Sequence, residues 1–517
     1  MRYKLGIDVG GTNTDAVLIS EDLKVKGSVK VATSNDIYSG IVNSIRQLLK
    51  ENPVDKDSIF QAMLGTTQCT NAIIERKNLA SVGVLRLAAP ASTGIPPMVD
   101  WDDELKATVV DYYIAKGGYE YNGKEISSFD EDEVRSFFSK IKGKVESVAI
   151  SCCFASIRNE HEKKAAQICK EVMGENVHVS ISSEIGSMGL IERENATILN
   201  AALYKVAKSF TEGFQKSLAD EGIKKADLYL SQNDGTLMTM EYAKKYPVLT
   251  IACGPTNSIR GANYLCKSDD AVVIDVGGTT TDIGVILHGF PRQSSQSAEI
   301  GGVRTNFRMP DVISIGLGGG SIVRQLEDGS VTIGPDSVGY KLTEEALVFG
   351  GDTLTATDIA VAAGLYDLGD KTKVENLDPN FVKKALATIK AMIEDSVDSI
   401  KISSDPVPVI LVGGGSIIVP EVISGAASIT KPNYFGTANA IGSAISKVSG
   451  NYEALVSFDK IPREQALENA KKEATELALK AGAKKGTVEI IDIEDVPLAY
   501  YPGNTSRIKV KAAGDLA

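Results

Sequence analysis

Two short segments of the chain carry the same pattern of aspartate, glycine and threonine. Residues 7–19 read IDVGGTNTDAVLI and residues 274–286 read IDVGGTTTDIGVI, so nine of the thirteen positions are identical. In each copy an apolar run ends in an aspartate, a Gly-Gly-Thr turn follows, and a second aspartate opens another apolar run. This spacing predicts a β-hairpin whose turn carries few side chains, so that a ligand can approach the backbone closely.

The composition of the turn suits phosphate binding. Consecutive N–H groups in a glycine-rich turn form a concave anion site, and threonine hydroxyls add further donors. A tight hairpin with Asx-type turn bonding would explain a single copy equally well, but two near-identical copies favour phosphate. We therefore predict nucleotide contacts from Gly10, Gly11, Thr12 and Asn13 in the first copy and from Gly277, Gly278, Thr279 and Thr280 in the second.

The aspartates that flank each turn indicate a cation. A carboxylate repels a bare phosphate, so its expected partner is Mg²⁺ or the water molecules of that ion. We predict that four aspartates are catalytic, namely Asp8, Asp15, Asp275 and Asp282, with Asp8 and Asp275 as the metal ligands. A Walker loop is excluded because GxxxxGK[ST] is absent. A dinucleotide fingerprint is excluded because a second strand, and not a helix, follows the glycines.

A third glycine cluster follows a strand-like run over residues 407–412. Gly413, Gly414 and Gly415 would let the backbone lie flat against a base or a ribose, although a plain turn is the simpler interpretation of this cluster alone. A fourth cluster, SIGLGGGS at residues 314–321, lies between the second hairpin and the third cluster.

As a set, the two hairpins and the late glycine turn resemble the actin, sugar kinase and Hsp70 superfamily. The resemblance implies a two-lobed, actin-like (ribonuclease H-like) α/β fold with ATP between the lobes. It also implies Mg²⁺ in the cleft and adenosine against Gly413–Gly415.

The segments between the turns resemble the hydantoinase A/5-oxoprolinase family more narrowly. They read LGTTQCTNAIIER at 64–76, IERENATILNA at 191–201 and DGTLM at 234–238, and together with SIGLGGGS they follow the family's order. The resemblance implies an ATP-dependent hydrolase that activates a cyclic amide (5-oxoproline, a hydantoin or a lactam) or a related carbonyl compound by phosphorylating it. It implies substrate contacts from Thr66, Thr67, Glu194, Asn195, Gly318 and Gly319.

Alternatives stay open at this point. The charged run over 192–195 is also typical of a solvated helix start. The chain could instead be a small-metabolite kinase, a ketone-carboxylase-type subunit or a non-catalytic ATPase switch of the same superfamily. Many enzymes of the family work with a B-type subunit, so the resemblance implies such a partner, in a hetero-oligomer or a homo-oligomer.

The net charge and the composition restrict the kinds of partner that the protein can bind. The net charge is −12, which argues against a nucleic acid or an anionic membrane, because both require a basic footprint. We find no secretory leader and no apolar run long enough to span a bilayer. The six cysteines are scattered without a CxxC pair, and the three histidines lack metal spacing. The sequence therefore predicts a cytoplasmic protein with reduced thiols.

The chain has 517 residues, which is too long for a single hydrophobic core, because a domain typically has about 150 residues. We predict an N-terminal lobe over 1–185, an ATPase lobe over 186–450 and a small α+β appendage over 451–517. Hydrophobic periodicity predicts helices over 37–50 and 160–173, and a buried strand over 145–155. A small-residue helix over 438–448 is expected to pack back on the first lobe. The appendage could cap the second lobe or contact a partner, and we favour the cap.

Overall fold

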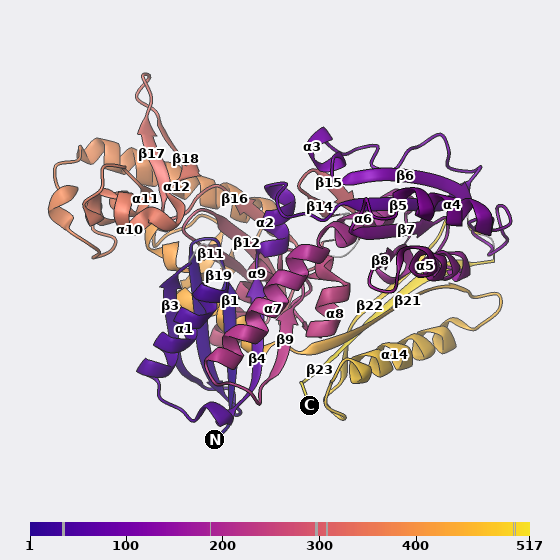
Figure 1. Ribbon diagram of the computed structural model, residues 1–517. Helices are drawn as coiled ribbons and strands as arrows, with labels where there is room; N and C mark the ends of the chain where they lie inside the picture. Colours follow the sequence, from indigo (N-terminus) through magenta and orange to yellow (C-terminus); the bar gives the residue numbers. More distant parts are fainter. Residues whose placement is uncertain (34–36, 187, 295–297, 307–308, 500, 502) are drawn as a thin grey trace.

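The structure is a computed structural model that describes residues 1–33, 37–186, 188–294, 298–306, 309–499, 501 and 503–517 (Figure 1). It has the predicted mixed α/β fold, with two lobes built on the same arrangement of strands. Within the described residues, every helix is too short or too polar to cross a membrane.

The first lobe is organised around a nine-stranded sheet, whose strand order is β22-β23-β21-β10-β9-β4-β1-β2-β3. Strand β1 pairs antiparallel with β2 and parallel with β4, so the first glycine turn joins two interior strands near the β3 edge of the sheet. The strands are β1 (Tyr3–Val9), β2 (Asn13–Ser20), β3 (Val25–Ala32), β4 (Ile59–Thr66), β9 (Asp227–Ser231), β10 (Leu237–Thr239), β21 (Val448–Ser457), β22 (Glu489–Pro497) and β23 (Thr505–Gly514).

Strand β2 shows why this sheet is covered on both faces. Its alternating residues enter two different clusters of buried side chains. Ala16 and Leu18 pack with helices α1 (Ile37–Glu51) and α7 (Tyr204–Asp220), whereas Val17 and Ile19 pack with α13 (Ala438–Ile445). The predicted return helix is therefore confirmed, and it contacts the first lobe as expected.

The second lobe repeats the pattern. Strand β11 pairs antiparallel with β12 and parallel with β19, and β16 adds to the free edge of β12 as β3 adds to β2. The strands are β11 (Ala271–Val276), β12 (Thr281–Leu287), β13 (Phe290–Pro291), β16 (Val312–Ile315), β19 (Val407–Val412) and β20 (Ala426–Thr430). Helices α11 (Ala356–Ala362) and α12 (Pro379–Ile400) bury one face of this sheet, and α9 (Cys253–Cys266) buries the other.

A separate parallel sheet of four strands lies within the range that we predicted as one N-terminal lobe. Its order is β6-β5-β7-β8, and Figure 1 shows it to the side of the two hairpin lobes. Helices α4 and α5 bury one face and α6 the other, and the predicted helix over 160–173 and the predicted strand over 145–155 are both found here. The elements are β5 (Val82–Ala89), β6 (Val109–Lys116), β7 (Ser147–Cys152), β8 (His178–Ile181), α4 (Glu131–Ile141), α5 (Glu160–Met173) and α6 (Leu190–Ala202).

Short elements complete the chain. A 3₁₀ turn over Ser182–Glu184 leads toward α6, and another over Gly414–Ile418 follows β19. The others are α2 (Gln68–Ile74), α3 (Asp103–Lys106), α8 (Met240–Lys245), α10 (Leu342–Glu345) and the two-stranded ribbons β14 (Ala298–Ile300) with β15 (Val303–Thr305) and β17 (Ser321–Gln325) with β18 (Val331–Ser337).

The C-terminal appendage does not cap the second lobe, so that expectation is wrong. It is an α+β unit, as predicted, but its strands extend the sheet of the first lobe through the parallel pair β10–β21. Helix α14 (Arg463–Lys480) covers these strands with alanines spaced at helical intervals, which are Ala466, Ala470, Ala474 and Ala478. Figure 1 places this unit beneath the four-stranded sheet and away from the second lobe.

Helices α9 and α13 cross at a separation that only glycine allows. A Cβ atom at Gly261 of α9 would lie 1.8 Å from the carbonyl oxygen of Ala438, and a Cβ at Gly442 of α13 would lie 1.8 Å from that of Asn257. Because α9 packs on the second lobe and α13 on the first, this contact joins the two lobes.

We therefore expect Gly261→Ala to destabilise the protein by about 2 kcal/mol, since overpacking of a close contact costs about 1–3 kcal/mol. Urea unfolding measures the change in the free energy of unfolding. Gly213→Ala on α7 is the matched control, because its Cβ meets no atom within 4 Å and alanine is the better helix former. Equal stability of the two variants would contradict the close crossing.

Candidate nucleotide site

The three glycine clusters predicted from the sequence line one cavity of about 290 Å³ between the lobes. The cavity wall includes every predicted nucleotide-binding residue, namely Gly10, Gly11, Thr12, Asn13, Gly277, Gly278, Thr279, Thr280, Gly413, Gly414 and Gly415. The two hairpin turns approach each other there, since a Cβ at Gly278 would lie 2.9 Å from the Cγ2 atom of Thr12. Segments more than 260 residues apart thus form one surface rich in backbone donors.

Both turns close in the same way. The N–H of Gly10 donates to the carbonyl of Asn13 over 3.0 Å, and the N–H of Gly277 donates to that of Thr280 over 2.9 Å. Gly413 turns the chain after β19 with a φ of +85°, and a Cβ there would lie 2.2 Å from the carboxylate of Asp275. Glycine is therefore required at Gly413 by both its conformation and its surroundings.

The four predicted aspartates form two cross-strand pairs. Asp8 lies opposite Asp15 in the first hairpin, and Asp275 lies opposite Asp282 in the second. Asp15 and Asp275 line the cavity, whereas Asp8 and Asp282 are not among its lining residues. The repeat therefore places one carboxylate of each pair toward a ligand and one behind it.

Burial raises the pKa values of three of these carboxylates, those of Asp8, Asp275 and Asp282. Burial and the neighbouring charge of Asp15 raise the pKa of Asp8 to about 7, although a hydrogen bond from Asn257 opposes the shift. Burial also raises the pKa of Asp282 to about 6 and, less strongly, the pKa of Asp275. Each raised pKa means that the site by itself does not stabilise the ionised carboxylate.

The two pairs differ in the residue on the next strand. Lys30 of β3 lies opposite Asp15, and its ammonium is 2.8 Å from a carboxylate oxygen of Asp15. At the equivalent position of the second hairpin, Ser314 of β16 lies opposite Asp282 and donates its hydroxyl to that carboxylate. The repeat is therefore symmetric in backbone but not in charge.

Lys30 and the two central helices supply residues that the sequence reasoning missed. Among the described residues that line the cavity, Lys30 is the one lysine or arginine. Helix α9 contributes Asn257, whose amide lies 3.5 Å from Asp8, and Ser258, which donates to Asp275. Asn439, at the start of α13, donates to Asp8 over 3.0 Å. Lys30 could have been found from the pairing of the strands, because it lies on the strand after the hairpin, directly opposite Asp15.

The donor set fits a nucleotide with a divalent cation. No cluster of three or more His, Cys, Asp or Glu in the described part of the chain could hold a metal ion by itself. Mg²⁺ does not require one, because it keeps several waters and binds through one or two carboxylates together with phosphate oxygens. A cation beside Asp15 and Asp275 would offset the burial and the like charge of Asp15 that together raise the pKa of Asp275.

Four of the predicted substrate residues surround the hairpin turns. Thr66 ends β4 in register with Val9, and the N–H of Thr67 donates to the Val9 carbonyl. Gly319 lines the cavity, and its N–H donates to Gly277 over 3.0 Å. A Cβ at Gly318 would lie 2.6 Å from the backbone of Gly278, so this glycine lets the 316–320 loop support the second turn.

The structure does not bring Glu194 and Asn195 to this cavity. Glu194 is 1 % exposed and forms an ion pair with the fully buried Arg86, with a further hydrogen bond from Ser151. Asn195 is fully buried and accepts from the indole N–H of Trp101 over 2.9 Å. Glu194 lies where α6 packs on the four-stranded sheet, whereas Asn195 also donates to the carbonyl of Arg304 in β15, so the contacts of both residues are those of a polar core.

The buried pair gives a prediction. We expect Glu194→Ala to lower the free energy of unfolding by about 3–5 kcal/mol, because it leaves the Arg86 guanidinium buried without its carboxylate. Glu192→Ala on the same helix is the control and should change stability by less than about 1 kcal/mol. Thermal or urea unfolding checks the difference, and similar stability of the two variants would contradict a core role for Glu194.

The raised pKa of Asp8 gives a second prediction, in the absence of nucleotide and metal. Between its unfolded pKa near 3.8 and its folded pKa of about 7, the folded state binds more protons than the unfolded state, so the fold loses stability as pH rises toward 7 and the loss levels off above it. On acidification from pH 8 to 6.5, the wild type should gain on the order of 1 kcal/mol of stability relative to Asp8→Asn. Urea unfolding at both pH values measures this difference. A pH-independent difference would contradict the shift.

Comparison with known proteins identifies the family of the chain. Residues 4–173 match the model of the hydantoinase/oxoprolinase N-terminal region, and residues 193–400 match that of hydantoinase/oxoprolinase. The chain is 27 % identical to the uncharacterized protein MJ0964 of Methanocaldococcus jannaschii, over 77 % of this chain and 62 % of that protein. It is 26 % identical to the caprolactamase subunit alpha of Pseudomonas jessenii, over 70 % of this chain and 54 % of that subunit.

The match to 5-oxoprolinase 1 of Arabidopsis thaliana is 24 % identical, over 70 % of this chain and 31 % of that protein. The chain thus matches less than two thirds of the length of these relatives.

Two solved structures share the fold over nearly the whole chain. The ATP-dependent caprolactamase from Pseudomonas jessenii superposes with a TM-score of 0.78 and 18 % identity, covering 100 % of this chain and 88 % of that one. Nucleotide-free acetone carboxylase gives a TM-score of 0.73 and 17 % identity, with 99 % and 88 % coverage. The predicted two-lobed, actin-like α/β fold is confirmed. With the family matches covering most of its length, the chain belongs to the hydantoinase/oxoprolinase family.

Proposed function

We propose that the chain uses ATP to phosphorylate the carbonyl oxygen of a cyclic amide, such as a hydantoin, 5-oxoproline or a lactam, or of a related carbonyl compound. One observation carries the proposal: both glycine turns of the repeat line a single cavity that also contains carboxylates and one lysine. The printed names of the relatives, caprolactamase and 5-oxoprolinase, support a cyclic amide as the substrate class.

The chemistry explains why ATP would be needed. An amide carbonyl is a poor electrophile, and transfer of the terminal phosphoryl group to its oxygen supplies a leaving group. Water then adds to the carbon and the ring C–N bond breaks, which leaves an acyl phosphate and a free amine. A second water adds to the acyl carbon, phosphate leaves with the original carbonyl oxygen, and the ring-opened acid remains. The bound nucleotide and Mg²⁺ supply the phosphoryl group and its charge neutralisation.

The chain's own residues have distinct roles in this proposal. The turns at Gly10–Asn13 and Gly277–Thr280 present backbone donors to the phosphates, and Lys30 adds the positive charge on the side of the first lobe. Asp275, as predicted, and Asp15, in place of the predicted Asp8, would hold Mg²⁺ or its waters at the cavity wall, because Asp8 does not line the cavity. Asp8 and Asp282 accept hydrogen bonds behind them. Gly413–Gly415 gives a flat backbone surface for the base or ribose.

Two further features of the proposal concern water and partners. Facing lobes would exclude water from the terminal phosphate of ATP until it has been transferred to the carbonyl oxygen, which favours phosphorylation of the substrate over wasteful ATP hydrolysis. Relatives are named as subunits, caprolactamase alpha and acetone carboxylase beta, so we propose that a B-type partner subunit completes the enzyme.

Phosphate release tests the reaction. With Mg²⁺ and ATP, the protein should release phosphate only when 5-oxoproline, a hydantoin, a lactam or a small ketone is added, with or without a B-type subunit. A ring-opened acid supports the hydrolase, and a carboxylated ketone supports the carboxylase-type alternative. Phosphate retained on the small molecule supports a kinase. ATP turnover that ignores every compound supports an ATPase switch.

Substitution of the aspartates tests the site. Asp275→Ala should lower substrate-dependent phosphate release by about 100-fold or more, because Mg²⁺ loses a ligand. Asp8→Ala should lower it by about 10- to 100-fold, because Asn257 and Asn439 lose the carboxylate that they bond behind the cavity wall. Asp405→Ala, at an exposed position of the second lobe, is the control and should keep full activity. Circular dichroism checks that each variant is folded. Full activity of either cleft variant would show that the cleft assignment is wrong.

A further inference from the structure

The ion pair between Lys30 and Asp15 lies in the wall of the nucleotide cavity. The ammonium is 2.8 Å from Oδ2 of Asp15, which accepts its hydrogen bond, and 2.6 Å from Oδ1. Oδ1 is buried and accepts no hydrogen bond from the described part of the chain. The carboxylate is 2 % exposed and the lysine side chain is 32 % exposed, so a ligand that enters the cavity meets the ammonium before the carboxylate.

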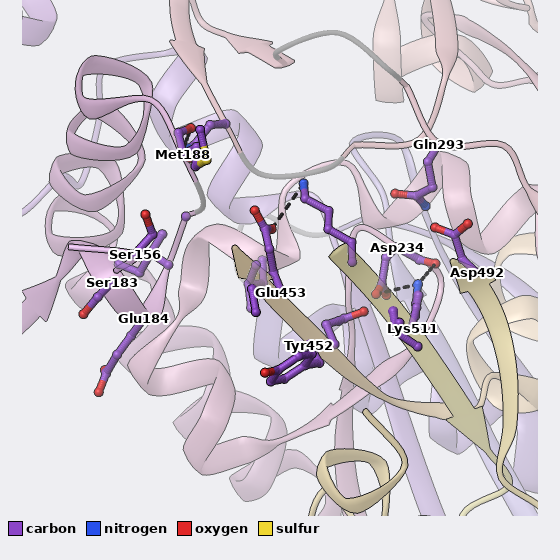
Figure 2. A pocket seen from close by; sticks show the side chains of 18 of the residues that line it. Ser156, Ser183, Glu184, Met188, Asp234, Gln293, Tyr452, Glu453, Asp492 and Lys511 are labelled. Atoms are coloured by element: carbon purple, nitrogen blue, oxygen red, sulfur yellow. Dashed lines mark hydrogen bonds and ion pairs between the residues drawn. The ribbon is translucent and has the colours of Figure 1, made fainter. Parts of the chain in front are cut away.

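A second lysine–aspartate pair shows how a structural pair differs from this one. Lys511 and Asp234 lie 2.7 Å apart in the wall of a separate cavity of about 370 Å³, beside strands β21 and β23 (Figure 2). Both side chains are about nine-tenths buried, and the other carboxylate oxygen of Asp234 accepts the N–H and the hydroxyl of Thr236. The Lys30 pair is instead buried on one side only, and one of its carboxylate oxygens has no hydrogen bond.

Lys30 also has room to leave Asp15. A Cβ at Gly414 would lie 3.6 Å from the Cε atom of Lys30, and one at Gly436 would lie 3.9 Å from it. Because these two cavity-lining positions carry no side chain, the flexible lysine stem can rotate there. The first glycine turn reaches β2 at Asn13, two residues from Asp15, which is about 7 Å of strand. Rotation of the stem therefore carries the ammonium from the carboxylate toward the turn.

The charges of the pair work against a metal or a nucleotide that binds alone. Mg²⁺ on Asp15 would lie next to the ammonium, and a phosphate on Lys30 would lie next to the carboxylate. Like charges at such distances repel strongly in a cavity that is shielded from water. When both ligands bind, one ion pair is replaced by two, carboxylate with metal and ammonium with phosphate.

We propose that Lys30 and Asp15 form a switchable ion pair, which opens when metal and nucleotide bind together and stays closed when only one of them is present. Lys30 then binds phosphate and Asp15 binds the metal, so each ligand strengthens the binding of the other. The inference rests on the nucleotide and metal site of the proposed function. The coupling comes from the first lobe alone, because Ser314 takes the position of Lys30 in the second hairpin.

Metal binding without nucleotide tests whether Lys30 competes for Asp15. The full chain is titrated with Mn²⁺, a substitute for Mg²⁺ whose unbound fraction is measured by electron paramagnetic resonance. Lys30→Met should bind Mn²⁺ about tenfold more tightly than the wild type, because the carboxylate is released. Lys26→Met is the matched control, since Lys26 is an exposed lysine on the same strand, and it should leave the affinity unchanged.

Nucleotide binding without metal tests the other half of the exchange. ADP is titrated by calorimetry in the presence of EDTA. Lys30→Met should weaken ADP binding about tenfold, whereas Asp15→Asn should strengthen it about tenfold, because the ammonium is freed for the phosphates. In the Lys30→Met background, Asp15→Asn should strengthen it by less than about threefold. Circular dichroism checks folding, and if Lys30→Met does not fold, the gain from Asp15→Asn alone decides.

The two affinities of Lys30→Met must change in opposite directions, because structural damage would weaken both. Weaker binding of both ligands, or no change in either, would overturn the proposal, as would an Asp15→Asn variant that gains no affinity for ADP or gains equally with and without Lys30. A wild-type protein that binds no ADP would overturn this inference and the proposed function together. Failure to release phosphate from a protein that passes these titrations would refute the proposed reaction alone.

Discussion

The crossing of α9 and α13 is the contact on which the cleft depends. Each helix packs on the sheet of a different lobe, and each meets the other's backbone at a glycine. The same helices carry Asn257, Ser258 and Asn439, which bond Asp8 and Asp275. A small residue at the crossing therefore sets both how close the lobes lie and where the carboxylates of the cleft are held.

The carboxylates themselves oppose folding. Burial of four aspartates near one another costs free energy, and the raised pKa values of Asp8 and Asp282 show that the protein alone compensates for only part of it. The two hairpins offset this free-energy cost differently. The ammonium of Lys30 lies against Asp15, whereas only the hydroxyl of Ser314 lies against Asp282. A duplicated backbone thus supports two chemically different half-sites, one partly neutralised and one acidic.

Much of the nucleotide cavity was predictable from the sequence, because the glycine turns are local features whose spacing is independent of tertiary context. The helices over 37–50 and 160–173 were predictable for the same reason. Tertiary pairing decided the rest. No local pattern shows that Leu237 pairs with Val448 and so draws the appendage into the first sheet. Nor does any local pattern show that Glu194 pairs with Arg86, which lies on a strand 108 residues earlier. A charged run on a helix looks the same in sequence whether it faces solvent, substrate or a buried arginine.

Three consecutive residues in the first turns of α9 bond three different parts of the chain. Thr256 donates to the carbonyl of Asn233 in the β9–β10 connection, Asn257 bonds Asp8 of the first hairpin, and Ser258 bonds Asp275 of the second. One helical turn therefore fixes the two hairpin carboxylates relative to each other and to the sheet of the first lobe. Any change in the spacing of the lobes would have to move this turn together with both carboxylates or break one of these three bonds.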